Sequence, residues 1–196
     1  MKINVFKRYN SILERYLSKK SIEQLEFLWN DKKRFYHNVS HLENMINCIE
    51  SNIYFNELKL YEKHTLLIGI FMHDAIYDPR KQDNEDRSID FFKKSYIGKD
   101  TLMVQNVIKL IETTKHRKRP VYRLERIFWD ADNNKFKKGY AALLTNEKLI
   151  RKENSFATNA VYKEKRISFL KTCLGLFNDA VDKDINKLIK FVEENY

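Results

Sequence analysis

The segment 58–77 most constrains the fold, because its apolar residues occupy nearly every side of a helix. Its centre, 66–72, reads Leu-Leu-Ile-Gly-Ile-Phe-Met. A helix that is apolar all round is stable only when other elements surround it. The apolar run is also far shorter than the roughly 20 residues that a membrane-spanning helix needs. We therefore predict a buried central helix, ended with the help of Pro79, and no membrane span.

The remaining sequence predicts more helices packed around this one. Ser21-Ile22-Glu23-Gln24 has the form of a capping box and predicts a helix over 21–32. Leu42, Met45, Ile46 and Ile49 form one apolar stripe of a helix that begins near His37. Further helices are expected at 85–95, 101–114, 121–130, 137–152, 163–176 and 184–194. With only 4 Gly and 2 Pro, no strict alternation and no glycine-rich phosphate loop, the chain is predicted to be all-α.

Size and charge limit the domain count and the class of partner. A chain of 196 residues predicts one domain over 1–196. Charged residues near the amino terminus stand where a signal peptide is apolar, so we expect a cytoplasmic protein. Cys48 and Cys173 lack the spacing of a zinc site and are predicted to be buried free thiols. The net charge of +10 favours anionic partners, and no feature predicts an oligomeric state.

Four of the five histidines stand in groups with acidic or aromatic neighbours, and the fifth, His64, is expected to be an ordinary surface or packing residue. His37 and His41 are four residues apart, which would place them on one face of a helix. This spacing also occurs in zinc proteases of the HExxH type. The glutamate that those enzymes need is missing here, so that chemistry is excluded.

His73-Asp74 follows the apolar helix, where a carboxylate is costly to bury without a cation or hydrogen-bond donors. A metal ion would remove that cost, but Asp74 can equally cap the next turn while His73 bonds a backbone carbonyl. Asp130 and Asp132 form a second acidic group after an apolar segment, with an N-cap role as the alternative for Asp132. Two histidines and two aspartates suit Mn²⁺, Fe²⁺, Co²⁺, Ni²⁺ or Zn²⁺, and Mg²⁺ less readily.

Several blocks in chain order resemble the HD superfamily of metal-dependent phosphohydrolases, and in particular a bacterial group of predicted HD phosphohydrolases. They are Arg34-Phe35-Tyr36-His37-Asn38-Val39-Ser40-His41, Phe71-Met72-His73-Asp74-Ala75-Ile76-Tyr77-Asp78-Pro79, Asp83-Asn84-Glu85-Asp86-Arg87-Ser88, Asp130-Ala131-Asp132 and the later Arg166. The resemblance covers most of the chain. It implies an HD-type helical bundle in which His41, His73, Asp74 and Asp132 bind the metal, with Asp130 as the alternative to Asp132.

The same resemblance implies roles for three more residues. The first block is similar to the YHNxxH signature of cyclic nucleotide phosphodiesterases, in which the first histidine protonates the leaving oxygen. This makes His37 the expected general acid, a task that suits imidazole near neutral pH. The purine-clamping glutamine segment of those enzymes has no counterpart here. Glu85 and His116 match positions that face the active site, where Glu85 would orient a water or a ligand, or either residue would assist a second metal.

Arg34, Lys115 and Arg117 are candidates for holding phosphate, because guanidinium and ammonium groups pair with phosphate oxygens. Solvated basic surface is an equal alternative for each of them. We expect hydrolysis of a small-molecule phosphate ester, preferably a nucleotide, by metal-activated water. The alternative is a non-catalytic HD-type module that senses nucleotides. A nucleic-acid-binding role rests on the positive charge alone and is not favoured.

Overall fold

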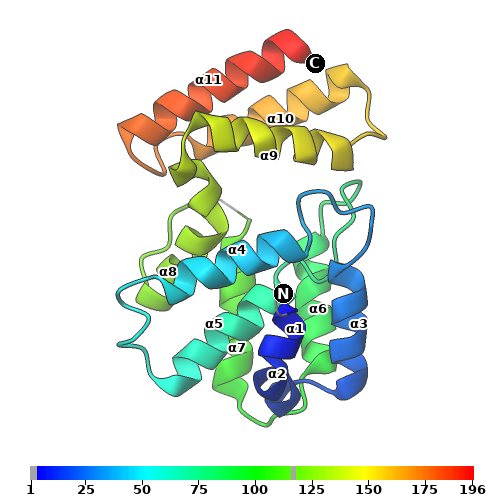
Figure 1. Ribbon diagram of the computed structural model, residues 1–196, viewed down its shortest axis with the longest axis vertical. Helices are drawn as coiled ribbons and strands as arrows, with labels where there is room; N and C mark the ends of the chain where they lie inside the picture. The colour runs from blue at the N-terminus through cyan, green and yellow to red at the C-terminus, as the bar shows by residue number, and fades with distance from the viewer. Residues whose placement is uncertain (1–3, 116–117) are drawn as a thin grey trace.

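The computed structural model describes residues 4–115 and 118–196, and the regular elements in these two ranges are helices (Figure 1). One isolated antiparallel bridge joins Leu17 to Tyr96. The prediction of an all-α fold is therefore confirmed. None of the described helices combines the length and the apolar character that crossing a membrane requires.

The helices follow one another with short connections. They are α1 (Val5–Arg8), α2 (Asn10–Tyr16), α3 (Lys19–Trp29), α4 (Val39–Glu50), α5 (Leu60–Met72), α6 (Asn84–Ser95), α7 (Thr101–Thr113), α8 (Arg123–Asp132), the 3-10 helix η1 (Asn133–Lys138), α9 (Tyr140–Glu153), α10 (Asn159–Cys173) and α11 (Asp179–Asn195).

The larger hydrophobic core is built around α5, whose residues 64–72 are all buried. This confirms the prediction of a buried central helix. Gly69 lets α7 and α8 approach closely, because a Cβ there would lie 2.9 Å from Leu110 Cδ1 and 3.2 Å from Phe128 Cε2. Trp29, at the end of α3, donates a hydrogen bond of 2.8 Å from Nε1 to the carbonyl of Phe71. The last turn of α5 is thus fixed from several sides.

A second hydrophobic core lies in the carboxyl-terminal part of the chain. It is formed by side chains of η1 and of α9 to α11, among them Leu143, Leu170, Ile185 and Leu188. Figure 1 shows these three long helices, coloured yellow to red, as a separate layer beside the larger helical body. The chain passes from α8 through η1 into this layer. There α9 faces the side of the larger body on which α4 lies.

Several helix boundaries differ from the predictions, and three of the differences concern motifs on which the predictions relied. The predicted capping box at Ser21 is wrong, because α3 begins at Lys19 and the Ser18 hydroxyl accepts the Ser21 amide at 3.2 Å. The central helix ends at Met72 rather than near 77, so Pro79 is not what ends it. α4 begins at Val39, since Asn38 Oδ1 accepts the Ser40 amide at 2.9 Å and caps the helix there.

Two further expectations concern side chains outside the site. His64 is a packing residue, as expected, buried on α5 with Nδ1 2.8 Å from the Tyr16 hydroxyl. Both cysteines are free thiols. Cys173 is buried as predicted, whereas Cys48 is only partly buried because it lies at the side of the apolar stripe of α4.

Candidate metal centre and active-site cavity

His41, His73 and Asp132 form a buried group that can hold a metal ion. One ligand atom from each lies within 4.8 Å of the other two. The two Nε2 atoms are 3.3 Å apart, and His41 Nε2 is 3.4 Å from Asp132 Oδ1. His41 on α4, Asp132 at the end of α8 and His73, directly after α5, therefore bring their ligand atoms to one point.

The spacing of these atoms fits a shared cation. Nitrogen ligands lie roughly 2.0–2.1 Å from a zinc ion, which puts two of them roughly 2.8–3.0 Å apart in octahedral geometry and roughly 3.3–3.4 Å apart in tetrahedral geometry. The observed separations of 3.3 and 3.4 Å agree with the tetrahedral spacing. His73 Nδ1 lies 2.8 Å from the Ile70 carbonyl and donates to it, which leaves Nε2 for the group.

Asp74 lies beside the three-residue group. Its Oδ2 is 3.1 Å from His73 Nε2, and its side chain is 16% exposed, so the carboxylate borders the cavity rather than the core. The carboxylate contacts a ring nitrogen, which argues against the alternative in which Asp74 caps the following turn. Asp132 likewise makes no side-chain cap hydrogen bond to η1. Neither contact of the two aspartates is a helix cap, and each carboxylate contacts a histidine of the group.

Asp130, the alternative to Asp132, points elsewhere. Its Oδ1 lies 2.7 Å from Lys137 Nζ and 3.8 Å from Arg119 Nη2. Two residues along a helix face different directions, so Asp130 and Asp132 cannot serve the same site. The structure selects Asp132.

The charges of the group attract one another strongly. Burial lowers the pKa of His73, but the carboxylates of Asp74 and Asp132 outweigh burial and raise that pKa to about 9. Burial would raise the pKa of Asp74, yet His73 holds it well below its usual range. For His41 burial dominates and lowers the pKa, despite the bond to Asp132. The two carboxylates therefore favour a positive charge between them, either a proton or a metal ion.

His37 does not share a helix face with His41, contrary to the prediction, because the cap at Asn38 starts the helix after it. The two rings still lie near each other, with centroids 6.0 Å apart. His37 Nδ1 is 2.7 Å from Glu153 Oε2 at the end of α9. The other oxygen of Glu153 accepts the amides of Tyr36 at 2.8 Å and His37 at 2.9 Å.

Glu153 is buried, and its hydrogen bonds keep it ionised. Burial would raise the pKa of Glu153, but the bonds from His37 and the two amides outweigh burial and lower it. Tyr77 stacks on the His37 ring at 4.1 Å and donates its hydroxyl to Glu153 Oε2 at 3.2 Å. A carboxylate at one ring nitrogen fixes the orientation of an imidazole and leaves the other nitrogen for chemistry.

These groups border one cavity of about 240 Å³. Its lining includes His37, His73, Asp74, Glu85, Asp132 and Lys135, with Arg166 at its edge. Glu85 thus faces the cavity as the resemblance implied. Burial, followed by the charge of Asp74, raises the pKa of Glu85. The cavity combines carboxylates, imidazoles and two cations within reach of the metal-binding group.

Of the residues predicted to hold phosphate, Arg34 and Lys115 are described, and neither lines this cavity. Arg34 is buried and donates from Nη1 to the Asp74 carbonyl at 2.7 Å and from Nη2 to the Ala75 carbonyl at 2.9 Å. Bonds from a charged donor contribute roughly 1.5–3 kcal/mol each, so Arg34 fixes the turn that carries Asp74. Lys115 instead pairs with Asp86 at 2.7 Å. His116 and Arg117 lie outside the described residues.

Three residues of the site received no role from the sequence: Lys135 and Arg166, which line the cavity, and Glu153, which contacts His37. Glu153 meets His37 across 116 positions of chain, and no local pattern signals such a contact. Arg166 belongs to the resembling blocks, which was the only signal for it. Lys135 stands in a basic stretch that looks like ordinary surface.

No model of a known protein family matches the chain, and no curated protein sequence matches it either. Membership of the HD superfamily is therefore an expectation from the motifs. The assignment of a function rests on the geometry of the site.

Proposed function

We propose that this protein is a metal-dependent phosphohydrolase of the HD type that acts on a phosphate ester. One observation carries the proposal: His73 and Asp132, two members of a buried group of two imidazoles and a carboxylate, line a cavity that also holds an oriented third imidazole, His37. The motifs supply the order of these residues along the chain. The distances between the ligand atoms of His41, His73 and Asp132 bring these three residues together.

His41, His73, Asp74 and Asp132 are the proposed metal ligands. Their mixed nitrogen and oxygen donors suit Mn²⁺, Fe²⁺, Co²⁺, Ni²⁺ or Zn²⁺, and Mg²⁺ less readily. Such an ion, when bound, supplies a water of lowered pKa and polarises a phosphoryl oxygen. Arg34 positions Asp74 by holding the carbonyls of the turn that bears it.

His37 is the proposed general acid. Because Nδ1 is engaged by Glu153, Nε2 is the ring nitrogen that hands a proton to the leaving oxygen. Glu153 stabilises the positively charged ring before transfer, and the stacked ring of Tyr77 limits its rotation. Glu85, at the cavity edge, is placed to orient a water by a hydrogen bond.

The direct test measures phosphate release and bound metal on the same sample. The protein loaded with Mn²⁺, Co²⁺ or Ni²⁺ is compared with His73→Ala and Asp74→Ala over a panel of nucleotides and simple phosphate esters. We expect losses of more than about 100-fold, since each variant removes a proposed ligand. His64→Ala is the matched control, because it removes a buried histidine of α5, the helix that His73 directly follows, at a distance from the site.

Wild-type turnover in both ligand variants would contradict the proposal. Nucleotide-dependent thermal stabilisation that requires the metal, without any turnover, would instead favour the sensing module.

A further inference from the structure

The cavity at the metal group has a neighbouring cavity on each side. One neighbour, of about 340 Å³, shares Asp132 and Lys135 with it. The other, of about 240 Å³, shares Ile150, Arg166 and Phe169 with it. The metal-binding group lies at the boundary between the central cavity and the larger one, because His73 lines the first, His41 lines the second and Asp132 lines both.

A cation stands at each of the two boundaries. Lys135 Nζ lies 5.1 Å from the centre of the Tyr36 ring, and the charge of Asp132 acts on it. Arg166 Nε donates at 2.6 Å to Glu147, a fully buried carboxylate that also accepts the Tyr162 hydroxyl at 2.6 Å. This bond fixes the guanidinium while occupying only one of its nitrogens. A phosphate in the central cavity would lie between the two cations.

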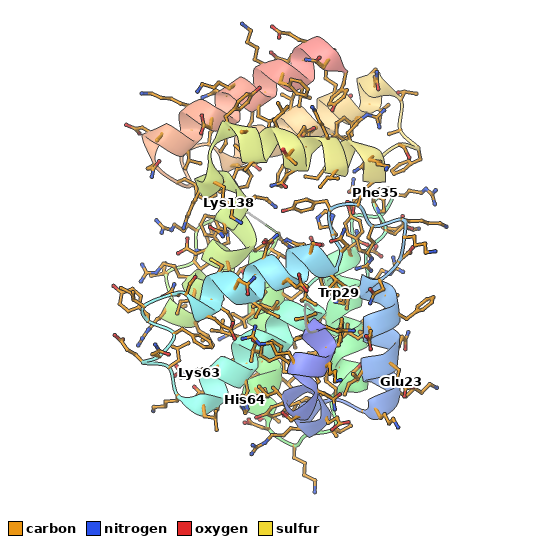
Figure 2. All side chains as sticks on the ribbon, viewed as in Figure 1. Glu23, Trp29, Phe35, Lys63, His64 and Lys138 are labelled. Atoms are coloured by element: carbon orange, nitrogen blue, oxygen red, sulfur yellow. The ribbon has the colours of Figure 1, made fainter. Side chains whose placement is uncertain are left out.

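The two flanking cavities differ in chemistry. The larger one carries the neutral amides of Asn44, Asn134 and Asn146, which come from α4, η1 and α9. Figure 2 shows two more of its residues, Phe35 and Lys138, at the level between α9 and α4. The smaller cavity is mostly apolar and aromatic, with Pro79, Phe156, Val161 and Phe169 among its lining residues.

We propose, on the basis of the function proposed above, that the substrate is a phosphodiester with two separate organic groups. The phosphate lies in the central cavity between Lys135 and Arg166. One group, rich in hydrogen-bonding atoms, occupies the amide-lined cavity. The other group, apolar or aromatic, occupies the cavity at Phe156 and Phe169. A monoester has only one organic group and would fill only one flanking cavity.

The reaction breaks one P–O bond and forms another. The oxygen of water adds to phosphorus, the ester oxygen leaves and takes a proton from His37, and the proton of the water restores His37. The products are an alcohol and a phosphomonoester, so the atoms of the diester and one water are all accounted for. No oxidant or second substrate is needed.

A pair of chromogenic esters tests the inference. Bis(p-nitrophenyl) phosphate and p-nitrophenyl phosphate release the same leaving group, and where the diester has its second organic group the monoester has an ionisable oxygen. We expect kcat/KM of the metal-loaded full chain to be at least tenfold higher for the diester. A preference for the monoester would overturn the inference while leaving the phosphohydrolase function intact. Hydrolysis of neither ester would contradict the function itself.

Two cavity variants give a second, independent reading. Asn146→Ala and Phe156→Ala alter opposite flanking cavities, and each is expected to raise KM for the diester by roughly 5- to 20-fold. At most one of them should affect the monoester, because a monoester fills only one side. The control is Phe27→Ala, which truncates an exposed side chain of α3. Equal effects of both variants on both esters would contradict the assignment of the two cavities.

Discussion

The two layers of the molecule contribute to the site in different ways. The larger helical body supplies the proposed ligands from α4, α8 and the end of α5. The layer of α9 to α11 supplies no member of the metal-binding group. It provides Glu153, which orients His37, and Arg166, which lines the cavity. One layer would thus bind the metal, and the other would position the proton donor and the substrate.

This comparison predicts that losing a ligand of the helical body has the largest effect. Asp132→Asn removes a charged ligand atom from the buried group, so bound metal and activity should both fall by more than about 100-fold. Asp130→Asn is the matched control, because that carboxylate pairs with Lys137 instead. Elemental analysis and turnover on both variants check this. Equal metal loss from the two variants would contradict the choice of Asp132 rather than Asp130 as the metal ligand.

Changes in the carboxyl-terminal layer should separate metal binding from turnover. Glu153→Gln replaces the carboxylate at His37 Nδ1 with a neutral amide, which stabilises the charged imidazole less. We expect kcat to fall by roughly 10- to 100-fold while bound metal stays at the wild-type amount. Loss of metal along with turnover would contradict the proposal that one layer binds the metal while the other positions the proton donor. Thermal unfolding of the same sample distinguishes a local effect from a folding defect.

The pH dependence of metal binding is a third test, because the metal competes with a proton on His73. The pKa of His73 is raised to about 9, so the metal-free ring is protonated at neutral pH and must lose that proton when it binds a metal. Metal affinity should therefore rise about tenfold per pH unit up to about pH 9 and then level off. Calorimetric titration in buffers of different ionisation enthalpy measures the released proton directly.

The same shift predicts the stability of the metal-free protein. A folded-state pKa above the ordinary value stabilises the fold fully below about pH 6.5, and this contribution is lost as the pH rises through about 9. The midpoint of thermal unfolding in chelator should accordingly fall over that interval. A flat profile would show that the carboxylates of Asp74 and Asp132 do not hold a proton on His73.

Local and distant contacts were not equally predictable from the sequence. The buried central helix and the His73-Asp74 group at its end follow from short patterns, because helix packing repeats every few residues. Arg34 could not be placed this way. It stands in a basic stretch that looks exposed, yet the turn after α5 buries it. The contact of Glu153 with His37 depends on how α9 lies across the body, which no window of sequence contains.

The smallest predicted effect concerns Arg166, at the boundary between the two layers. Arg166→Lys keeps the positive charge but loses the planar fork that bonds Glu147 through Nε and leaves two further nitrogens for phosphate oxygens. We expect KM to rise by roughly three- to tenfold with kcat and bound metal nearly unchanged, because the proton donor and the metal ligands stay in place. Lys171→Arg, at an exposed position of α10 that lines none of the three cavities, is the control. A fall in kcat without a change in KM would mean that Arg166 acts on the reaction itself, and the proposed division between metal binding and substrate positioning would have to be redrawn.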